Sequence, residues 1–372
     1  MNKSVYISIT NCITPLGFDV PSNVSNILNG ISGISKQINE RNHIAFYAAS
    51  VIDRKLDKAF SNIGNVDNYT KIEKLMILAL YPIIRENPTI KSALLISTTK
   101  GNITALEAND VENAQLPLLA KKVADFFNFK TQPILVSNAC VSGILAVAVA
   151  KRVIQSSIYD EVYVVSGDLV SEFVLSGFNS FQAMSDLPCR PYSINRTGVT
   201  LGEASAAVLV SANSQNALVK IIGDGSINDA NHISGPSRTG DGLVRSIQSA
   251  LYEAKIGIEK IDYISAHGTA TPFNDEMEAI AFNRLGLENV PVNSLKGYYG
   301  HTLGASGLLE TVIGIASMSN STLFASMGFD EIGVSQPINV IKNHTKKNID
   351  YWLKTASGFG GCNTAVIFEK YK

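Results

Sequence analysis

Short apolar runs alternate with longer helical stretches along this chain. In the first half, apolar residues follow one another without strict alternation, which is typical of strands in a sheet covered on both faces. The runs that predict such strands are residues 5–10, 93–97, 134–137, 161–166 and 206–210. Residues 143–154 predict a helix, and its lack of a polar stripe indicates burial between sheets.

The second half repeats this alternation. Residues 218–222, 261–265 and 364–368 predict strands, and residues 241–254 and 275–285 predict helices. The polar segment 211–216 is the best candidate for a boundary. We therefore expect an α/β protein with two similar halves, residues 1–212 and 213–372, although no residue-level repeat is evident.

The composition is that of an ordinary globular protein. The 372 residues are 45% hydrophobic with a formal net charge of -1, which gives no support for a nucleic-acid or membrane partner. No apolar run approaches the roughly 20 residues of a membrane helix, and the first residues do not resemble a secretory signal. The four cysteines are scattered, so neither a disulfide framework nor a zinc site is indicated. We expect a cytoplasmic enzyme.

A cysteine opens the apolar helix of the first half. The segment 137–143 reads Ser-Asn-Ala-Cys-Val-Ser-Gly, so a strand ends, small residues follow and Cys140 begins the helix. A thiol there faces unpaired backbone N–H groups and the positive end of the helix dipole, and both favour a nucleophilic thiolate. The alternative, a buried structural cysteine, is about as common.

A histidine follows a predicted strand of the second half. The segment 265–272 reads Ser-Ala-His-Gly-Thr-Ala-Thr-Pro, and an imidazole at His267 can donate a hydrogen bond or move a proton. A single such His is more often a hydrogen-bonded residue of a turn. Asp275 and Glu278 follow one helical turn apart and can share a helix face, or they are simply acidic residues near a helix start.

Two glycine-containing segments complete the candidate chemistry. In residues 293–307, glycines precede His301 and small residues follow it, which permits close approach of a loop and a helix to a ligand. Lys296 in the same segment either holds a carboxylate or is a solvated surface lysine. The segment 357–363 reads Ser-Gly-Phe-Gly-Gly-Cys-Asn and predicts a turn that offers backbone N–H groups.

Taken together and in this order, these motifs resemble the β-ketoacyl-acyl-carrier-protein synthases of the thiolase superfamily. The resemblance spans essentially the whole chain, including Gly202 and Glu203, and is closest to elongating (KAS II-like) synthases with a Cys-His-His triad. It implies a five-layered α-β-α-β-α sandwich of two duplicated halves, with the active site where the halves meet.

By this resemblance, Cys140 takes an acyl group from the phosphopantetheine thiol of acyl carrier protein. A malonyl-type extender then loses carbon dioxide, and the resulting carbanion attacks the Cys140 thioester. His267 and His301 match the two family histidines that assist decarboxylation and stabilise the developing enolate oxygen. The resemblance implies no metal or organic cofactor.

The resemblance also assigns supporting residues. Lys296 and Glu278 match a pair that orders the site, and Thr269 and Thr271 match threonines that hold the pantetheine arm. The backbone N–H groups of the nucleophile and of Phe359 match the oxyanion hole, and Phe359 matches a gating residue.

Three departures from the family pattern concern the acyl substrate and the subunit partner. The nucleophile segment lacks the commoner Thr-Ala-Cys-Ser-Ser sequence, and Cys362 stands where threonine is usual. The chain is also shorter, chiefly between Gly101 and Thr131, where relatives carry dimer-interface and acyl-pocket structure. Shortened synthases of this style resemble those that build aryl-polyene or flexirubin-like pigments.

Rival functions are weighed on the same residues. A thiolase needs a second catalytic cysteine before its glycine-rich turn and lacks the histidine of the His-Gly-Thr loop, whereas Cys362 follows the turn and His267 is present. A starter-unit synthase carries asparagine in place of one histidine. A non-catalytic partner subunit, like a chain-length factor, has lost its nucleophile, whereas this chain retains Cys140.

The expected partners are acyl carrier protein and a second ketosynthase chain. We expect a homodimer, or a heterodimer with a related synthase. Because the carrier protein of such systems is acidic, a local basic patch should steer its docking. Candidates for that patch are Lys71, Lys74, Lys121 and Lys122, which are otherwise solvated positions on helix faces.

Overall fold

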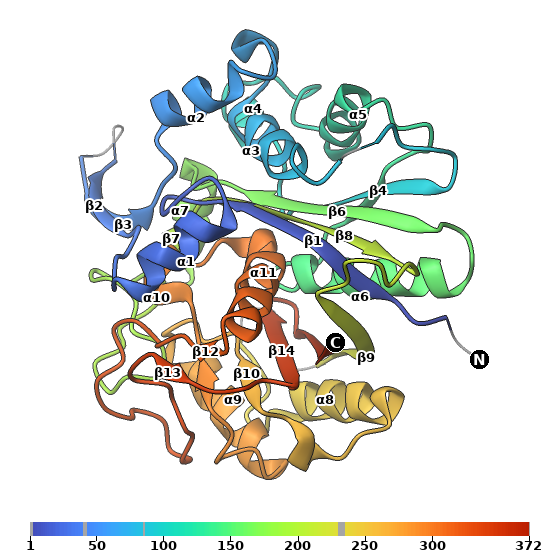
Figure 1. Ribbon diagram of the computed structural model, residues 1–372. Helices are drawn as coiled ribbons and strands as arrows, with labels where there is room; N and C mark the ends of the chain where they lie inside the picture. Colours follow the sequence, from blue (N-terminus) through green and yellow to red (C-terminus); the bar gives the residue numbers. More distant parts are fainter. Residues whose placement is uncertain (1–2, 40–42, 85, 230–234, 372) are drawn as a thin grey trace.

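The molecule consists of five layers, in which two sheet halves alternate with three layers of helices (Figure 1). The computed structural model describes residues 3–39, 43–84, 86–229 and 235–371. Within these residues, ten strands form one mixed sheet in the order β11-β10-β14-β15-β9-β1-β8-β6-β4-β5. The strands of the first half are β1 (Tyr6–Ile13), β4 (Ser92–Ser97), β5 (Ile134–Val136), β6 (Glu161–Asp168) and β8 (Ala204–Ser211). Those of the second half are β9 (Val219–Asn228), β10 (Tyr263–Ser265), β11 (Val292–Asn293), β14 (Tyr351–Gly358) and β15 (Cys362–Lys370).

The two halves of the sheet have the same topology. From β1 outward, the pairings with β8, β6, β4 and β5 are antiparallel, antiparallel, parallel and parallel. From β9 outward, the pairings with β15, β14, β10 and β11 follow the same order. A short antiparallel contact between β1 and β9, at Tyr6 and Ile7, joins the halves. The predicted five-layered, duplicated fold is therefore confirmed.

The middle layer contains two equivalent buried helices, α6 (Ser142–Gln155) and α11 (Ser306–Ser319), which follow β5 and β11. A Cβ atom on Gly143 would lie 2.6 Å from the backbone nitrogen of Leu308, and one on Gly307 would lie 2.5 Å from that of Ile144. Only glycine at the second position of each helix therefore allows the two N-terminal turns to touch.

The turns before these helices are also duplicated. Ala139 and Leu303 both have positive φ angles, 44° and 53°, and each lies three residues before the Ser-Gly pair that begins its helix. The halves therefore share a repeat that the sequence analysis did not detect, because Ser-Gly is almost all that the two segments have in common. In this repeat, Gly304 occupies the position that corresponds to Cys140.

Helices on the outer faces complete the sandwich (Figure 1). The first half is covered by α3 (Lys71–Leu80) and α5 (Leu116–Phe126), and the second by α8 (Asp241–Ala254) and α9 (Pro272–Arg284). The remaining helices are α1 (Val20–Leu28), α2 (Asp53–Phe60), α4 (Ile103–Glu107), α7 (Glu172–Ser180) and α10 (Lys296–Tyr299). Small strands β2 (Ser35–Ile38), β3 (Ala45–Ala49) and β7 (Leu201–Gly202) form one sheet, and β12 (Thr322–Leu323) and β13 (Thr345–Lys346) form another.

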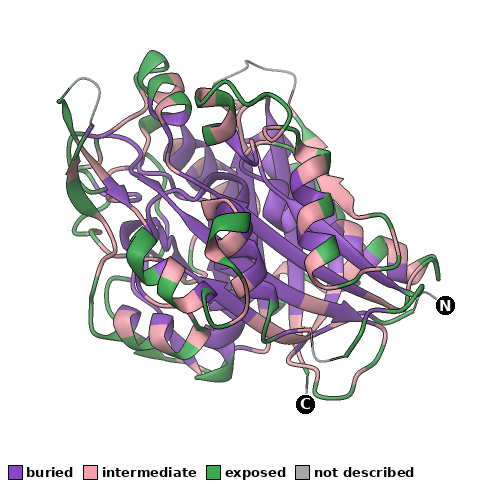
Figure 2. Ribbon diagram, turned by 90° about the horizontal axis from the view of Figure 1, so that it is seen from above, coloured by how far each residue is buried: buried purple, intermediate pink, exposed green. Residues whose placement is uncertain are grey.

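Apolar residues fill the spaces between these layers. One cluster lies between the sheets around α6 and α11, and two others lie beneath the outer helices of each half. Buried positions therefore run along the strands and the inner helix faces (Figure 2). The helix predicted at 275–285 begins earlier, at Pro272, because proline is favoured in the first helical turn. None of the helices within the described residues has the length and apolar character needed to cross a membrane.

Candidate active site

Cys140 lies in a sharp turn between β5 and α6. The left-handed conformation of Ala139 turns the chain so that Cys140 precedes the buried helix. The turn after β14 packs against it, because a Cβ on Gly358 would lie 3.0 Å from the backbone nitrogen of Cys140. Cys140 is 7% exposed, so its side chain is almost completely buried at the junction between the halves.

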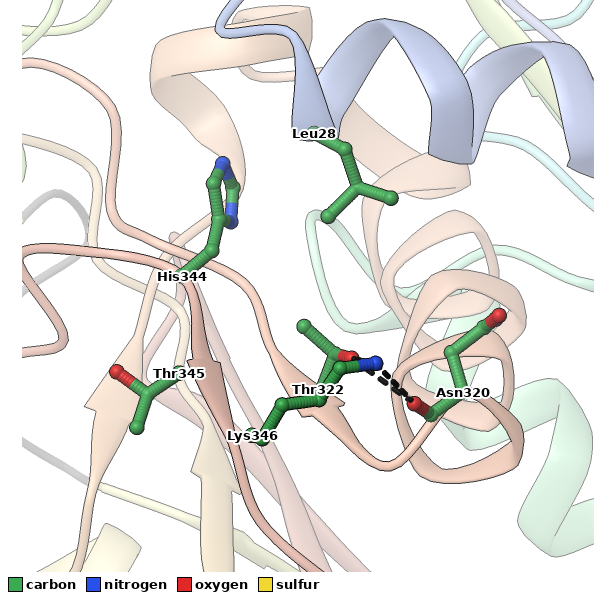
Figure 3. Close-up of a pocket in the computed structure, with 6 residues that line it drawn as sticks. All are labelled: Leu28, Asn320, Thr322, His344, Thr345 and Lys346. Atoms are coloured by element: carbon green, nitrogen blue, oxygen red, sulfur yellow. Dashed lines mark hydrogen bonds between the residues drawn. The ribbon is translucent and has the colours of Figure 1, made fainter.

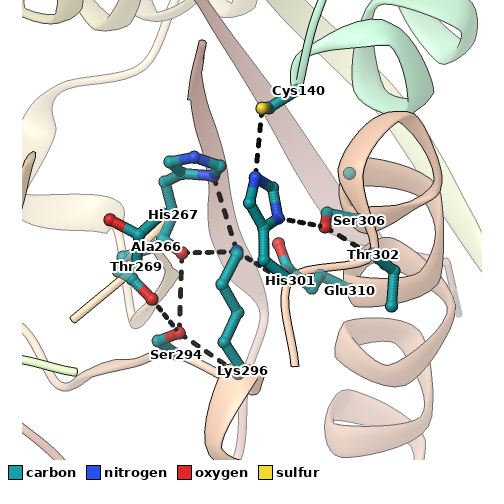
Figure 4. A network of polar contacts seen from close by, with 12 residues as sticks. Cys140, Ala266, His267, Thr269, Ser294, Lys296, His301, Thr302, Ser306 and Glu310 are labelled. Atoms are coloured by element: carbon teal, nitrogen blue, oxygen red, sulfur yellow. Dashed lines mark hydrogen bonds and ion pairs between the residues drawn. The ribbon is translucent and has the colours of Figure 1, made fainter. Parts of the chain in front are cut away.

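His301 contacts the sulfur directly (Figure 4). Its Nε2 atom lies 3.0 Å from Sγ of Cys140, and its Nδ1 atom lies 2.9 Å from Oγ of Ser306 at the start of α11. The backbone of His301 pairs with the segment at β7, where it donates to Thr200 and accepts from Gly202. The two segments approach each other so closely that a Cβ atom on Gly202 would lie 1.9 Å from the carbonyl oxygen of Tyr299.

His267 is the third member of the cluster. Its ring centroid lies 5.2 Å from that of His301, with the ring planes at 84°. The sulfur of Cys140 and one ring nitrogen from each of His267 and His301 all lie within 4.8 Å of one another. The structure thus brings together three side chains that come from two halves of the chain, as the sequence analysis requires for a shared pocket.

Glu278 and Asp275 of α9 hold the backbone of the His267 loop. The carboxylate of Glu278 accepts hydrogen bonds from the backbone N–H groups of His267, at 2.8 Å, and Gly268, at 2.7 Å. Asp275 accepts from the N–H of Thr269 at 3.0 Å. Both carboxylates are fully buried. They are therefore structural acceptors for the loop and not solvated residues of a helix start.

Lys296 is paired with Glu310 and not with Glu278, which corrects the pairing expected from the sequence. Its Nζ atom lies 2.6 Å from Oε1 of Glu310 on α11 and donates to the carbonyl oxygen of His267 at 2.5 Å. It also lies 3.5 Å from Nδ1 of His267 (Figure 4). Glu278 instead accepts hydrogen bonds from the backbone of the His267 loop.

The electrostatics of the site differ from the expectation of a resting thiolate. Burial raises the pKa of Cys140 to about 12, so the resting sulfur is a thiol. Burial and the charge of Lys296 hold the pKa of both His267 and His301 well below the ordinary histidine range. The cluster therefore contains a neutral thiol and two neutral imidazoles.

The hydrogen bonds also indicate different roles for the two imidazoles. An ammonium group can only donate, so Nδ1 of His267 accepts from Lys296 and its Nε2 carries the proton. Nε2 of His301 faces the thiol of Cys140 and is placed to accept its proton, while Nδ1 bonds with Ser306. One ring is thus arranged to donate and the other to accept.

Phe359 lies in the turn between β14 and β15 and is covered by α7. It stacks on Phe178, with centroids 5.5 Å apart, and meets Phe181 edge-on at 5.2 Å. Phe178 also contacts the ring of His301 at 6.4 Å. Cys362 follows the turn, and its Sγ lies 3.4 Å from the carbonyl oxygen of Phe359.

Sequence reasoning did not identify several residues of this region. Glu310 and Lys354 lie within mainly apolar segments that are expected to be buried. A charged residue inside such a segment is the only sequence feature that could have identified them. Phe178 and Phe181 are spaced three apart, which is a common core pattern. Thr269 and Thr271, which were identified, lie side by side, with their hydroxyl oxygens 2.8 Å apart.

The cluster has the donor set of a soft metal site, but its surroundings oppose a cation. A metal bound to Nε2 of His267 requires a proton on Nδ1, and that atom faces the Lys296 ammonium. Lys354 adds a second buried ammonium nearby. The arrangement therefore suits chemistry in which negative charge develops on a substrate oxygen.

A surface hollow of about 300 Å³ lies elsewhere in the molecule, between the ends of α1 and α11 and the two-stranded sheet of β12 and β13 (Figure 3). Lys346 on its wall already donates to Thr322 at 2.9 Å and to the carbonyl oxygen of Asn320 at 3.2 Å. None of its lining residues belongs to the cluster of Cys140, His267 and His301. The hollow therefore has no evident part in the chemistry of the site.

The four lysines considered for carrier-protein docking all have carboxylate partners within the chain. Lys71 pairs with two acidic residues, and Lys74, Lys121 and Lys122 each pair with one. Their charges are locally neutralised, which favours the alternative that they are ordinary helix-face residues.

Comparisons with known proteins agree with the geometry. The sequence profile of the beta-ketoacyl synthase N-terminal domain matches residues 91–216, and that of the C-terminal domain matches residues 218–330. A Schizosaccharomyces pombe protein named as a mitochondrial 3-oxoacyl-[acyl-carrier-protein] synthase is 27% identical over 99% of both chains. The 3-oxoacyl-[acyl-carrier-protein] synthase 2 of Staphylococcus aureus is 25% identical over 100% of this chain and 99% of its own.

Solved structures show the same fold. A ketosynthase in complex with its chain length factor from Xenorhabdus doucetiae superposes with a TM-score of 0.88 at 24% identity, over 99% of this chain and 98% of that chain. A beta-ketoacyl synthase from Burkholderia phymatum gives a TM-score of 0.85 at 23% identity over 100% of both chains. With both domain profiles matched in order, the chain belongs to the β-ketoacyl synthase family.

Proposed function

We propose that this chain condenses an acyl group held on Cys140 with a malonyl-type extender carried by acyl carrier protein, in fatty acid or polyketide synthesis. The observation that carries the proposal is the 3.0 Å contact between the Cys140 thiol and His301, with His267 facing both. Burial keeps the Cys140 thiol neutral, and burial together with the charge of Lys296 keeps both imidazoles neutral, which matches what the two half-reactions need.

In the first half-reaction, the acyl group moves from the carrier to the enzyme. His301 accepts the proton of Cys140 as the sulfur attacks the acyl thioester, which avoids a free buried thiolate. The backbone N–H groups of Cys140 and Phe359 stabilise the oxyanion. The C–S bond to pantetheine breaks, and the leaving sulfur takes the proton from His301.

In the second half-reaction, the extender loses carbon dioxide and its electron pair passes to the α-carbon. The Nε2–H group of His267 donates a hydrogen bond to the thioester oxygen, where the enolate charge develops. The α-carbon attacks the acyl carbonyl, the C–S bond to Cys140 breaks, and the sulfur regains a proton from solvent through His301. The product is a β-ketoacyl group on the carrier.

The substrate arm and the protein partners follow from the same site. The adjacent hydroxyl groups of Thr269 and Thr271 hold the pantetheine arm through its amide groups. The edge strand β5, whose residues are only half-buried, offers an unpaired backbone to a second ketosynthase-like chain. The four cysteines lie in described segments as free thiols, which suits the reducing cytoplasm.

The test uses purified protein with acyl- and malonyl-carrier protein, followed by intact-protein mass spectrometry. We expect an acyl adduct on the enzyme and a β-ketoacyl product on the carrier. Cys140→Ala removes the adduct, whereas Cys12→Ala, which alters another buried thiol far along β1, retains it. Retained acylation of Cys140→Ala would refute the nucleophile. A wild-type protein that neither loads nor condenses, alone or with a partner ketosynthase, would favour a non-catalytic subunit.

A further inference from the structure

Two buried lysines share one carboxylate behind the catalytic histidines. Oε1 of Glu310 lies 2.6 Å from Nζ of Lys296, and Oε2 lies 2.8 Å from Nζ of Lys354 on β14. Both lysine side chains are completely buried, and the glutamate side chain is 4% exposed. Glu310 thus contacts two ammonium groups, and the fully buried Glu278 is a second carboxylate whose charge acts on Lys354.

Lys354 also bonds the backbone that leads to His267. Its Nζ donates to the carbonyl oxygens of Ser265 at 3.1 Å and Ala266 at 3.4 Å, the last two residues before the histidine. Lys296 donates a hydrogen bond to the next carbonyl oxygen, that of His267. Glu278 accepts a hydrogen bond from the backbone N–H of the same residue. The peptide groups around His267 are therefore held from two sides by buried charged groups.

We propose that Lys354 is a positioning residue for the condensation. It fixes the backbone between β10 and His267, and by contacting Glu310 beside Lys296 it places a second buried positive charge near both imidazoles. This inference rests on the proposed function, because it concerns the groups assigned to proton transfer there.

The charge has a direct chemical consequence. A cation beside an imidazole disfavours a second proton on that ring. The pKa of His267 is lowered by burial first, then by Lys296, His301 and Lys354. That of His301 is lowered by burial, Lys296, Lys100 and Lys354 in that order.

Other charged groups also face this cluster. Glu310 opposes the lysines from α11, and Glu278 acts on Lys354 from α9. Burial lowers the pKa of Lys354 itself, while Glu310 raises it. Removing Lys354 takes away one of the positive charges that act on both rings, so both histidines should take up protons more readily.

The experiment compares Lys354→Met with wild type across pH. Acyl loading and condensation are followed separately by mass spectrometry. We expect Lys354→Met to slow condensation at least tenfold near pH 6.5 and to move the acidic limb of the rate profile upward by about half a pH unit or more. Lys354→Gln, which can still donate to the carbonyl oxygens of Ser265 and Ala266, should move the limb equally with a smaller loss of rate.

The matched control is Lys151→Met. Lys151 on α6 is also buried and lies 2.7 Å from Asp224, but it has no contact with the catalytic cluster. This variant should lose stability and keep the wild-type pH profile. An unshifted acidic limb in a folded Lys354→Met or Lys354→Gln enzyme would overturn the proposal, even if the rate falls, because a purely structural role predicts only that fall.

The protonation state of the histidines can also be measured in the wild-type protein, without any variant and without enzyme turnover. With ring carbons labelled, NMR should show two of the five histidines of the chain remaining neutral at every pH at which the protein stays folded. Ordinary titration of all five would contradict the proposed effect of the buried lysines on the two rings. Inactive wild type with two such neutral histidines would refute the proposed function and leave the electrostatic arrangement intact.

Discussion

Sγ of Cys140 lies 3.0 Å from Nε2 of His301, although 161 positions separate the two residues. The contact arises because each residue belongs to the turn that precedes one of the two central helices. Gly143 and Gly307 allow the N-terminal turns of these helices to touch. The duplicated halves thus place the thiol of one turn against the imidazole of the other.

The two histidines should separate the half-reactions. His301→Ala should slow both acyl loading and condensation, because the Cys140 thiol loses its proton acceptor. His267→Ala should leave loading within about a few-fold of wild type and lower condensation by roughly 10²-fold or more, because the enolate oxygen loses a donor. Single-turnover loading, compared with product formation, measures both effects. Equal losses in the two variants would contradict this assignment.

The helix contact at the centre should tolerate no added methyl group. Gly143→Ala would place a Cβ 2.6 Å from the backbone of Leu308, so we expect a loss of about 1–3 kcal/mol in the free energy of unfolding and weaker acylation of Cys140. Gly177→Ala on α7 is the control, because its Cβ would meet nothing within 4 Å. Chemical denaturation measures both. The idea fails if the two glycines respond alike.

Glu278 should matter for stability more than an ordinary acidic residue of α9. Glu278→Ala deprives two buried N–H groups, those of His267 and Gly268, of their acceptor. We expect a loss of about 2–4 kcal/mol in unfolding free energy. Glu276 lies on the same helix and accepts a hydrogen bond from Ser335 outside that helix. Glu276→Ala should lower the free energy of unfolding by about 1 kcal/mol or less. Comparable losses would show that the His267 loop does not depend on Glu278.

The stability of the protein should fall in acid because of the two buried histidines. Their folded-state pKa is lowered by burial and by Lys296, whereas the unfolded chain takes up protons near pH 6.5. Below that pH the unfolded state binds more protons than the folded state. The histidines' contribution to the free energy of unfolding is therefore fully present above about pH 6.5 and decreases as the pH falls. His267→Gln should reduce the slope between pH 6 and 5 by about 1.4 kcal/mol per pH unit. An unchanged slope would mean that His267 is already protonated in the folded state.

The sequence by itself determined the fold class, the order of most strands and the residues that were candidates for catalysis. These features depend on local patterns, since a buried strand, a helix such as 241–254 or a glycine before His301 is visible in a few consecutive residues. The helix α11 was not predicted, because Gly307 and its neighbouring small residues resemble a loop when their packing against α6 is unknown.

Only the tertiary structure decided which groups meet and how deeply they are buried. It paired Lys296 with Glu310 in place of Glu278, and it brought Lys354 behind His267 from a strand near the end of the chain. It also made the sulfur of Cys140 a thiol, because burial raises the pKa of this group. Electrostatic energy depends on distance and on exclusion of water, and neither quantity is encoded in local sequence spacing.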